Sequence, residues 1–168
     1  MNIRTRFLII IVCFSFQNGP SKAKPAADKS KLIKQNYELY PGQGYYKLHT
    51  KHSNWQEAKK ICAEEGAHLA IINSSEETET LRILRRRTPR SYTWVDNQPF
   101  IGISDLENEG EWKTIFDMPL NQTGFTQWAR RGPDGGRQEN CGDILLGIGK
   151  LNDSPCEAVR PFICEAEL

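Results

Sequence analysis

Cysteine is the residue type with the most definite chemistry in this chain of 168 residues. Five cysteines are present; Cys13 lies in an apolar stretch near the amino terminus, and the others are Cys62, Cys141, Cys156 and Cys164. An even number of cysteines in a secreted chain indicates two disulfides, for which three pairings are possible. A segment rich in Gly, Asn, Asp and Pro separates Cys141 from Cys156, whereas Cys62 and Cys164 are far apart. This spacing favours a nested pattern of one short loop and one long closure.

Zinc binding and catalysis find little support among the remaining reactive residues. No Cys-x-x-Cys spacing occurs, and His49, His52 and His68 lie far in sequence from the later cysteines. No nucleophile, paired carboxylates or His-Glu-x-x-His motif accompanies these histidines, so we expect no enzymatic activity. The net charge of +1 gives no chain-wide argument for binding nucleic acid or a membrane surface.

The amino terminus has the three parts of a secretory signal peptide. Arg4 and Arg6 form a basic start, FLIIIVCFSF is an apolar run, and Ser21-Lys22-Ala23 is a small-x-small cleavage site. The apolar run is shorter than the roughly 20 residues of a membrane span, and no second candidate follows it. We therefore predict a signal peptide at residues 1–23, a flexible polar leader at residues 24–36 and one secreted domain at residues 37–168.

Two helices are predicted in the first half of this domain. After the strand-like run YYKLHT, Ser53 and Gln56 form a capping box that opens a helix, and Gly66 suits its carboxyl end. A second capping box, Ser74 with Glu77, opens a helix that should end before a proline at residue 89. The short run HLAII between the two helices is predicted to be a strand.

Short strands separated by turn residues are predicted in the second half. These runs are FIGIS, EWKTI, CGDILLGI and PFICEA. Helices followed by strands indicate an α+β domain with an antiparallel sheet. Residues 117–142 follow neither period and are rich in Gly and Pro, and such a long loop is usually functional or disordered. Trp128, just before this loop's centre, is the tryptophan for which a sugar-stacking role competes best with a core position.

These motifs, in this order, resemble the C-type lectin-like domain family over about residues 40–165. SNWQEAKKICAEEGAHLAIINSSEE is similar to the family's first helix, first cysteine, strand and second helix start. FIGISDLENEGEW is similar to its central strand and hairpin, and ENCGDI and LNDSPCEAVRPFICE to its last three cysteines and its Trp-Asn-Asp segment. The subgroup most resembled is the insect haemolymph lectins that recognise bacterial lipopolysaccharide.

The resemblance implies a particular version of the α+β fold. Two helices should flank antiparallel sheets, and a long irregular loop should form the binding surface. The implied disulfides are Cys62–Cys164 and Cys141–Cys156, which are the nested pairs.

The resemblance also implies a calcium site in the long loop. In family members that bind sugar, side-chain oxygens hold one Ca²⁺, which takes roughly 6 to 8 oxygen ligands and also contacts two sugar hydroxyls. The matching positions that carry such oxygens are Asp134, Glu139, Asn152 and Asp153. Gly132 stands where the family places a Glu or Gln ligand, so GPD is neither the mannose-type nor the galactose-type triplet. Loss of this ligand need not abolish calcium binding, because water or a backbone carbonyl can fill the gap, but we expect it to lower the affinity.

A second calcium position of some family members is matched in part. Asp105 and Glu109 correspond to two of its ligands, but Gly135 and Asn140 occupy the places of two acidic ones. The alternative interpretation, which the sequence favours, is that Asp105 and Glu109 are turn residues of the hairpin.

Two further sets of residues suggest surface chemistry. Arginines flank the predicted binding loop at positions Arg130, Arg131 and Arg137, and guanidinium groups suit the phosphates of a bacterial glycolipid. Asn121-Gln122-Thr123 and Asn73-Ser74-Ser75 are acceptors for N-glycosylation. Asn121 is the better candidate, because Asn73 adjoins a helix cap.

Two functions from different classes follow. The first is a secreted lectin that binds carbohydrate through calcium and recognises microbial surface glycans such as lipopolysaccharide in innate immunity. The second is a lectin-like protein that binds a protein or lipid partner without calcium. The fold alone does not separate them, because the function of such a domain depends on its loop.

Overall fold

The computed structural model describes residues 28–88 and 94–167. Its α-helices are α1 (Lys29–Lys34), α2 (Trp55–Glu65) and α3 (Ser75–Arg87). Its strands are β1 (Glu38–Tyr40), β2 (Gly44–Ser53), β3 (His68–Leu69), β4 (Phe100–Ser104), β5 (Lys113–Thr114), β6 (Cys141–Leu145), β7 (Lys150–Ser154) and β8 (Arg160–Ala166). Short 3₁₀ turns are η1 (Trp94–Asn97), η2 (Leu120–Gln122) and η3 (Gly136–Gln138). The predicted signal peptide, residues 1–23, lies outside the described residues.

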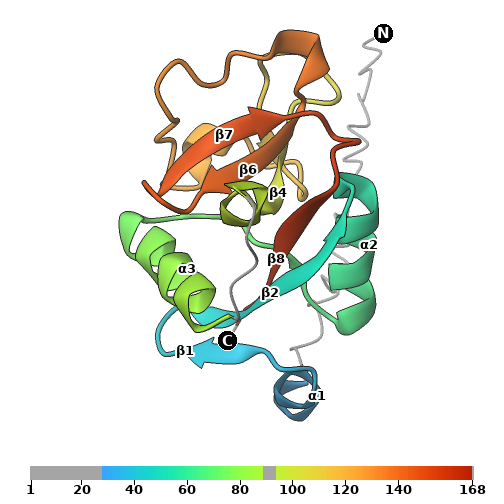
Figure 1. Cartoon of the computed structure of the whole chain (residues 1–168), viewed down its shortest axis with the longest axis vertical. Coiled ribbons are helices and arrows are strands. Elements are labelled where there is room, and N and C mark those ends of the chain that lie inside the picture. The colour runs from blue at the N-terminus through green and yellow to red at the C-terminus, as the bar shows by residue number, and fades with distance from the viewer. Residues whose placement is uncertain (1–27, 89–93, 168) are drawn as a thin grey trace, which may run out of the picture.

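The strands form one mixed sheet with the order β1-β2-β8-β4-β6-β7, in which β3 also pairs with β8 and β5 with β4. All pairs are antiparallel except β4 with β8, which meet in parallel at Phe100 and Phe162. The α+β class is therefore confirmed, with one parallel pair that the sequence did not predict. Figure 1 shows α2 and α3 on either side of the β2–β8 pair, with β6, β7 and the irregular loop at the opposite end from α1 and β1.

Both predicted helices are present, and one starts differently from the expectation. The side chain of Asn54, not of Ser53, caps α2 by accepting a hydrogen bond from the N–H of Glu57. Ser53 pairs instead with Arg160 at the end of β2, so the capping box predicted at Ser53 is wrong. Gly66 ends α2 with φ at 86°, in the left-handed region that favours glycine.

The second helix begins and ends as predicted. Ser74 Oγ accepts a hydrogen bond from the N–H of Glu77, and the Glu77 carboxylate accepts one from the N–H of Asn73. The helix ends at Arg87, with Thr88 as its carboxyl-terminal cap. Glu77 is nevertheless buried. Its carboxylate also accepts a hydrogen bond from the Tyr46 hydroxyl in the core.

The leader predicted at residues 24–36 is wrong for the part that the structure describes. Asp28 caps α1, and Leu32 of this helix is 1% exposed and packs into the same hydrophobic cluster as Tyr37 and Trp55. Lys31 Nζ also donates to the backbone carbonyl of Glu64 at the end of α2. The folded unit therefore includes residues 28–36.

Two hydrophobic clusters and two disulfides hold the elements together. One cluster joins α3 to the sheet through Leu81, Leu84, Ile101, Ile144 and others, and the second joins α1 and α2 to Phe100 and Phe162. The disulfides are Cys62–Cys164, from α2 to β8, and Cys141–Cys156, from β6 to the turn after β7. Both pairings are as predicted.

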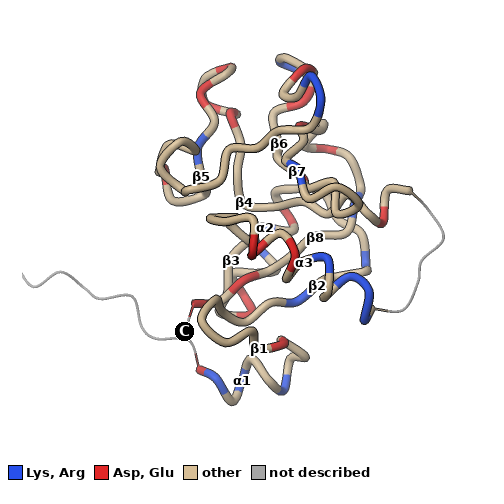
Figure 2. Tube along the Cα trace, turned by 90° about the vertical axis from the view of Figure 1, so that its left-hand side faces the viewer, with Lys and Arg blue, Asp and Glu red and all other residues tan. Residues whose placement is uncertain are grey.

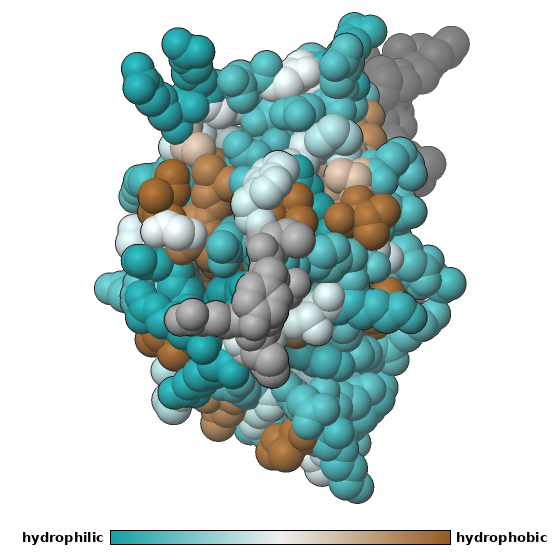
Figure 3. Space-filling model, viewed as in Figure 1, coloured by the Kyte–Doolittle hydropathy of each residue, from teal (hydrophilic) through white to brown (hydrophobic). Residues whose placement is uncertain are grey.

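The outer surface is mainly hydrophilic on the face shown in Figure 3, with hydrophobic side chains in separate clusters. No helix within residues 28–88 and 94–167 has both the length and the apolar character needed to cross a membrane.

Candidate functional site

The four residues expected to hold calcium come from two neighbouring segments. Asn152 and Asp153 lie on β7, and Asp134 and Glu139 lie in the loop that leads into β6. The antiparallel β6–β7 pair fixes the first segment. A parallel bridge between Trp128 and Leu151 ties the incoming loop to β7. The structure therefore brings the two segments together at one end of the sheet, where the irregular loop lies above β6 and β7 in Figure 1.

Asp153 connects the two segments directly. Its side chain is buried, and Oδ2 accepts hydrogen bonds from the backbone N–H groups of Asp134 at 2.8 Å and Gly135 at 2.7 Å. The other oxygen, Oδ1, is buried without a hydrogen-bond partner. One carboxylate oxygen thus holds the loop, and the second is a buried acceptor without a hydrogen-bond partner.

Glu139 lies close to the same group of negative charges. Burial raises the pKa of its carboxyl above the ordinary value, and the charges of Asp153 and Asp134 raise it further. Gly135 is needed beside it, because a Cβ at that position would overlap the Glu139 side chain. Carboxylates that repel one another in this way are a favourable environment for a cation.

Asn152 is oriented by a buried network that sequence reasoning missed. Its Nδ2 donates to Asp143 Oδ2 at 3.2 Å and to the backbone carbonyl of Asp153 at 2.6 Å. Asp143 also accepts a hydrogen bond from Ser154 Oγ and lies 3.7 Å from the Arg160 guanidinium. Burial raises the pKa of Asp143 to about 6. The available signal was an aspartate inside the apolar run CGDILL.

Gly132 occupies a position with room for a side chain. A Cβ there would lie 3.6 Å from Trp128 Cε3 and 3.5 Å from the carbonyl oxygen of Ala129, which are ordinary van der Waals distances. The peptide bond between Gly132 and Pro133 is cis. The missing ligand is therefore a feature of the sequence and is not imposed by crowding.

Only one of the two Asp105 carboxylate oxygens makes the hydrogen bond expected of a turn residue. Its Oδ2 accepts a hydrogen bond from the N–H of Gly110 at 2.8 Å, as expected of a turn. Its Oδ1 and the Oδ1 of Asn140 are both buried without a hydrogen-bond partner. These two side chains, together with Glu109 and Arg137, help to line a polar cavity of about 610 Å³. Burial, and to a smaller extent the charge of Asp153, raises the pKa of Asp105.

The loop arginines differ in their surroundings. Arg130 and Arg131 are exposed on the segment between Trp128 and the Gly-Pro bond. Arg137 lines the acidic cavity with Glu107 and Glu109. Figure 2 shows two loop tips at the end of the domain opposite α1, one with acidic positions and the other with acidic and basic positions together.

The two candidate glycosylation sites are both exposed at their asparagines. Asn121 lies in η2, and Asn73 lies just before α3. Thr123, the third residue of the first acceptor, is buried, and its hydroxyl bonds the backbone at Leu120 and Phe125. Thr123 therefore has a structural role of its own.

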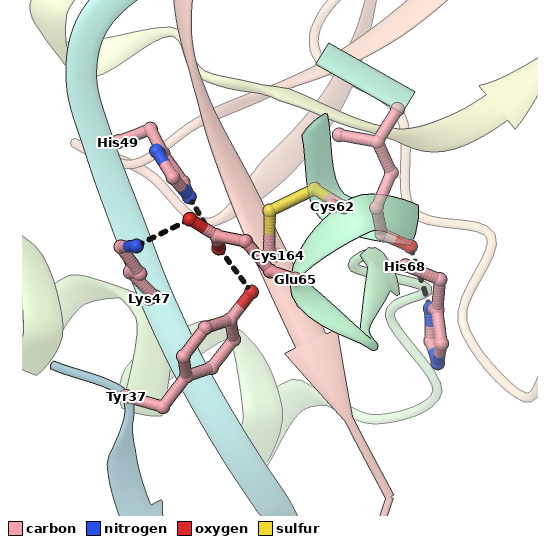
Figure 4. The surroundings of a disulfide bond; sticks show 8 residues. Tyr37, Lys47, His49, Cys62, Glu65, His68 and Cys164 are labelled. Carbon is pink, nitrogen blue, oxygen red and sulfur yellow. Dashed lines mark hydrogen bonds and ion pairs between the residues drawn. A yellow bond between two sulfur atoms is a disulfide. The ribbon is translucent and has the colours of Figure 1, made fainter. Parts of the chain in front are cut away.

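One histidine lies next to a cysteine, contrary to the expectation from their separation in sequence. Figure 4 shows the Glu65 carboxylate accepting hydrogen bonds from Tyr37 and Lys47 and contacting His49 Nε2 at 3.0 Å, beside the Cys62–Cys164 disulfide. Ligand atoms of His49, Glu65 and Cys164 lie within 4.8 Å of one another. Because Cys164 is bonded to Cys62 and Lys47 pairs with Glu65, this group forms a structural contact between β2, α2 and β8.

A comparison of the sequence with family models decides the membership of the chain. The model described as the lectin C-type domain matches residues 51–166. The chain belongs to the C-type lectin domain family. The fold, the disulfide pairing and the order of motifs agree with this membership, and domains of this family typically bind ligands and are not enzymes.

Known C-type lectins are similar over most of the chain. The hemolymph lipopolysaccharide-binding protein of Periplaneta americana is 44% identical over 147 residues, which are 86% of this chain and 57% of that protein. C-type lectin domain family 4 member F of Mus musculus is 32% identical over 142 residues, 80% of this chain and 23% of that protein. The chain thus spans little more than half of the first relative and a quarter or less of the second.

A solved lectin structure supports the fold independently. The carbohydrate-recognition domain of the mouse scavenger receptor C-type lectin superposes with a TM-score of 0.65 and 26% identity, covering 79% of this chain and 95% of that one.

The loop of this C-type lectin has suitable donors for calcium. The four side chains that match the family's calcium ligands all carry oxygen atoms, which a hard cation prefers as ligands. They are those of Asp134, Glu139, Asn152 and Asp153. Asp153 Oδ1 and Asp105 Oδ1 are buried oxygens that lack a partner. Within the described residues, no three of the loop carboxylates have ligand atoms that all lie within 4.8 Å of one another. They are therefore more widely spaced than the group around Glu65. The residues therefore fit calcium by chemistry, with side-chain adjustment.

Proposed function

We propose that this C-type lectin is a secreted protein that binds carbohydrate through calcium and recognises microbial surface glycans, lipopolysaccharide among them. The observation that carries the proposal is the buried, unpartnered Oδ1 of Asp153, at the point where Asp134 and Glu139 approach β7. A bound calcium ion would supply coordination positions for two sugar hydroxyls. Asp134, Glu139, Asn152 and Asp153 would hold it.

Microbial recognition is supported by similarity and by local charge. The cockroach relative at 44% identity is named for hemolymph and for lipopolysaccharide binding. The two disulfides suit an oxidising, extracellular environment. The exposed guanidinium groups of Arg130 and Arg131 adjoin the loop and would pair with phosphates of such a ligand.

The second cation position is part of the same proposal. Asp105 Oδ1 and Asn140 Oδ1 are both buried without a hydrogen-bond partner. These oxygens support a cation at this position more strongly than the sequence pattern does. Glu109, on the wall of the same cavity, would be a third ligand.

The experiment is retention of the mature protein on immobilised lipopolysaccharide, mannose and galactose, each with calcium and with a chelator. We expect retention on at least one resin, with elution by the chelator. The matched variant is Asp153→Asn, which keeps one oxygen to accept the loop N–H groups but removes the charge, and it should be retained less. Absence of retention on every glycan would contradict the proposal.

A calcium-independent mode is the second candidate, and one contact favours it. Asp153 Oδ2 accepts hydrogen bonds from the backbone N–H groups of Asp134 and Gly135, so protein groups contribute to holding the loop. Retention that is insensitive to chelator and to Asp153→Asn would establish this mode in place of the first. Charge reversal at Arg130 and Arg131 should weaken lipopolysaccharide binding in either mode.

A further inference from the structure

A cavity of about 520 Å³ lies beside the candidate calcium site, and none of the four residues proposed to hold calcium lines it. Its lining includes Trp112, Leu120, Thr126, Trp128 and Pro133. Pro133 is the middle residue of the Gly-Pro-Asp triplet, so the wall of the cavity continues directly into the loop that carries Asp134.

The walls of this cavity are mainly apolar and well supported. Trp112 and Leu120 are buried members of the hydrophobic core, against which Trp128 packs. The rings of Trp112 and Trp128 meet edge to face, with their centroids 4.7 Å apart. The backbone N–H of Leu120 donates to the carbonyl of Trp112, and that of Ala129 donates to Leu151, so both tryptophans are attached to fixed elements. The cavity is therefore preformed.

The polar groups of the lining include Glu111, Lys113 and the buried Nε1 of Trp112, which has no hydrogen-bond partner, and exposed cations lie nearby in the chain. Arg130 and Arg131 lie on the short segment that joins two of its walls, Trp128 and Pro133, and both are exposed. Lys113 is a further cation of the lining, although Glu107 pairs with it at 3.0 Å.

We propose that this cavity binds the hydrocarbon chain of an anionic glycolipid whose head group lies at the loop. The apolar walls suit methylene groups, which need no hydrogen-bond partners, better than a sugar ring with hydroxyls on every side. The neighbouring guanidinium groups complement an anionic head group. The inference deepens the proposed function, on which it rests for the position of the head group.

The direct test is a series of alkyl glucosides with the same sugar and chains of six, eight and ten carbons, below micelle-forming concentrations. Tryptophan fluorescence and calorimetry would follow binding, with calcium and with a chelator. We expect affinity to rise with chain length, by up to about fourfold for each methylene removed from water. The emission should shift to the blue, and the dependence on chain length should survive the chelator. Affinity independent of chain length would overturn the inference.

A matched pair of variants locates the binding. Thr126 is exposed and lines the cavity, so Thr126→Phe should fill it and remove the dependence on chain length. Gln122 is also exposed but is not part of the lining, so Gln122→Phe should behave as the parent protein. Thermal melts would verify that both variants fold. Equal behaviour of the two variants would also overturn the inference.

Failure of the inference differs from failure of the proposed function. Calcium-dependent retention on glycan resins, without any effect of chain length or of acyl removal from lipopolysaccharide, would reject the cavity and keep the lectin function. A chain-length effect that Thr126→Phe removes, without retention on any glycan, would support the cavity and reject sugar recognition.

Discussion

Gly132 is the residue that most limits the candidate calcium site. The family places a carboxylate or amide oxygen at this position, and the loop here offers only backbone. The surroundings leave ordinary contact distances for a Cβ next to Trp128 and Ala129. A side chain at this position should therefore be accommodated without a change in the loop conformation.

We expect Gly132→Glu to tighten calcium binding by on the order of tenfold, because it adds one charged oxygen ligand. Gly132→Ala is the control, since it fills the same space without a ligand and should leave the affinity nearly unchanged. Isothermal titration with calcium would measure both. Equal affinities for the Glu and Ala variants would show that this position does not face the ion.

A buried pair of carboxyl groups sets a pH dependence elsewhere in the domain. The Tyr46 hydroxyl lies 2.6 Å from Glu77 and 3.3 Å from Glu165, and the N–H of Ile71 donates to Glu165. Burial, together with the charge of Glu77, raises the pKa of Glu165 to about 8. The folded protein therefore holds a proton that the unfolded chain releases near pH 4.5.

The stabilisation from this proton is fully present below about pH 4.5 and is lost as the pH rises through about 8. Glu165→Gln keeps an acceptor for Ile71 but has no charge to develop. We expect the melting temperature of this variant to fall less between pH 5 and pH 9 than that of the parent protein. Parallel curves for the two proteins would contradict a raised pKa at Glu165.

At the scale of the elements, α1 shows where local sequence patterns stop being informative. Its six residues are polar except for Leu32 and Ile33, a composition typical of a disordered leader. Its order depends on Leu32 entering a cluster with Trp55 and on Lys31 reaching the end of α2. These contacts join residues that are far apart in the sequence, so no local pattern reveals them.

Two adjacent aliphatic side chains on α1 provide a direct test of its contribution to stability. Leu32 is 1% exposed and Ile33 is 62% exposed. Leu32→Ala should lower the free energy of unfolding by about 2 to 5 kcal/mol, whereas Ile33→Ala should change it by less than about 0.5 kcal/mol. Urea unfolding would measure both. A similar small loss in the two variants would mean that α1 does not contribute to the stability of the domain.

The helix caps show a subtler limit of sequence reasoning. Ser53 and Asn54 are both suitable cap residues. The capping-box pattern of Ser53 with Gln56 led to the prediction of Ser53 as the cap. The structure extends β2 through Ser53, because its partner Arg160 lies at the start of β8. Strand pairing with a residue more than 100 positions away therefore determined which cap was used.

At the scale of the whole molecule, the two disulfides have different tasks. Cys62–Cys164 joins residues separated by 102 positions and connects α2 to β8. Cys141–Cys156 spans 15 positions and fixes the base of the loop region. The chain-entropy account gives the longer closure the greater effect on stability.

Replacing Cys62 and Cys164 by alanine should lower the free energy of unfolding by about 4 to 5 kcal/mol, against about 3 kcal/mol for the Cys141 and Cys156 pair. Urea unfolding of the two double variants would compare them. Calcium titration should show the opposite order, with the larger loss of affinity for the pair next to the loop. A uniform effect of both pairs on calcium affinity would contradict this division of tasks.

The motifs predicted the fold and the disulfide pairing, and they placed Asp134 and Asp153 in segments that the structure brings into contact. Cysteine spacing and ordered motifs were sufficient for the disulfides and for bringing Asp134 and Asp153 together. The network of Asp143 behind Asn152 and the approach of His49 to Cys164 depend on strand register, which a single sequence does not display. The unpaired Asp105 Oδ1 likewise appears only when burial is known.

The double hydrogen bond from the loop backbone to Asp153 has a kinetic consequence. Because the backbone N–H groups of Asp134 and Gly135 both donate to Asp153 Oδ2, we expect a cation arriving at this end of the domain to meet an ordered loop. Its association rate should then be set by diffusion and by loss of its hydration shell, with no slow conformational phase. The far-ultraviolet circular dichroism spectrum should look the same before and after the ion enters.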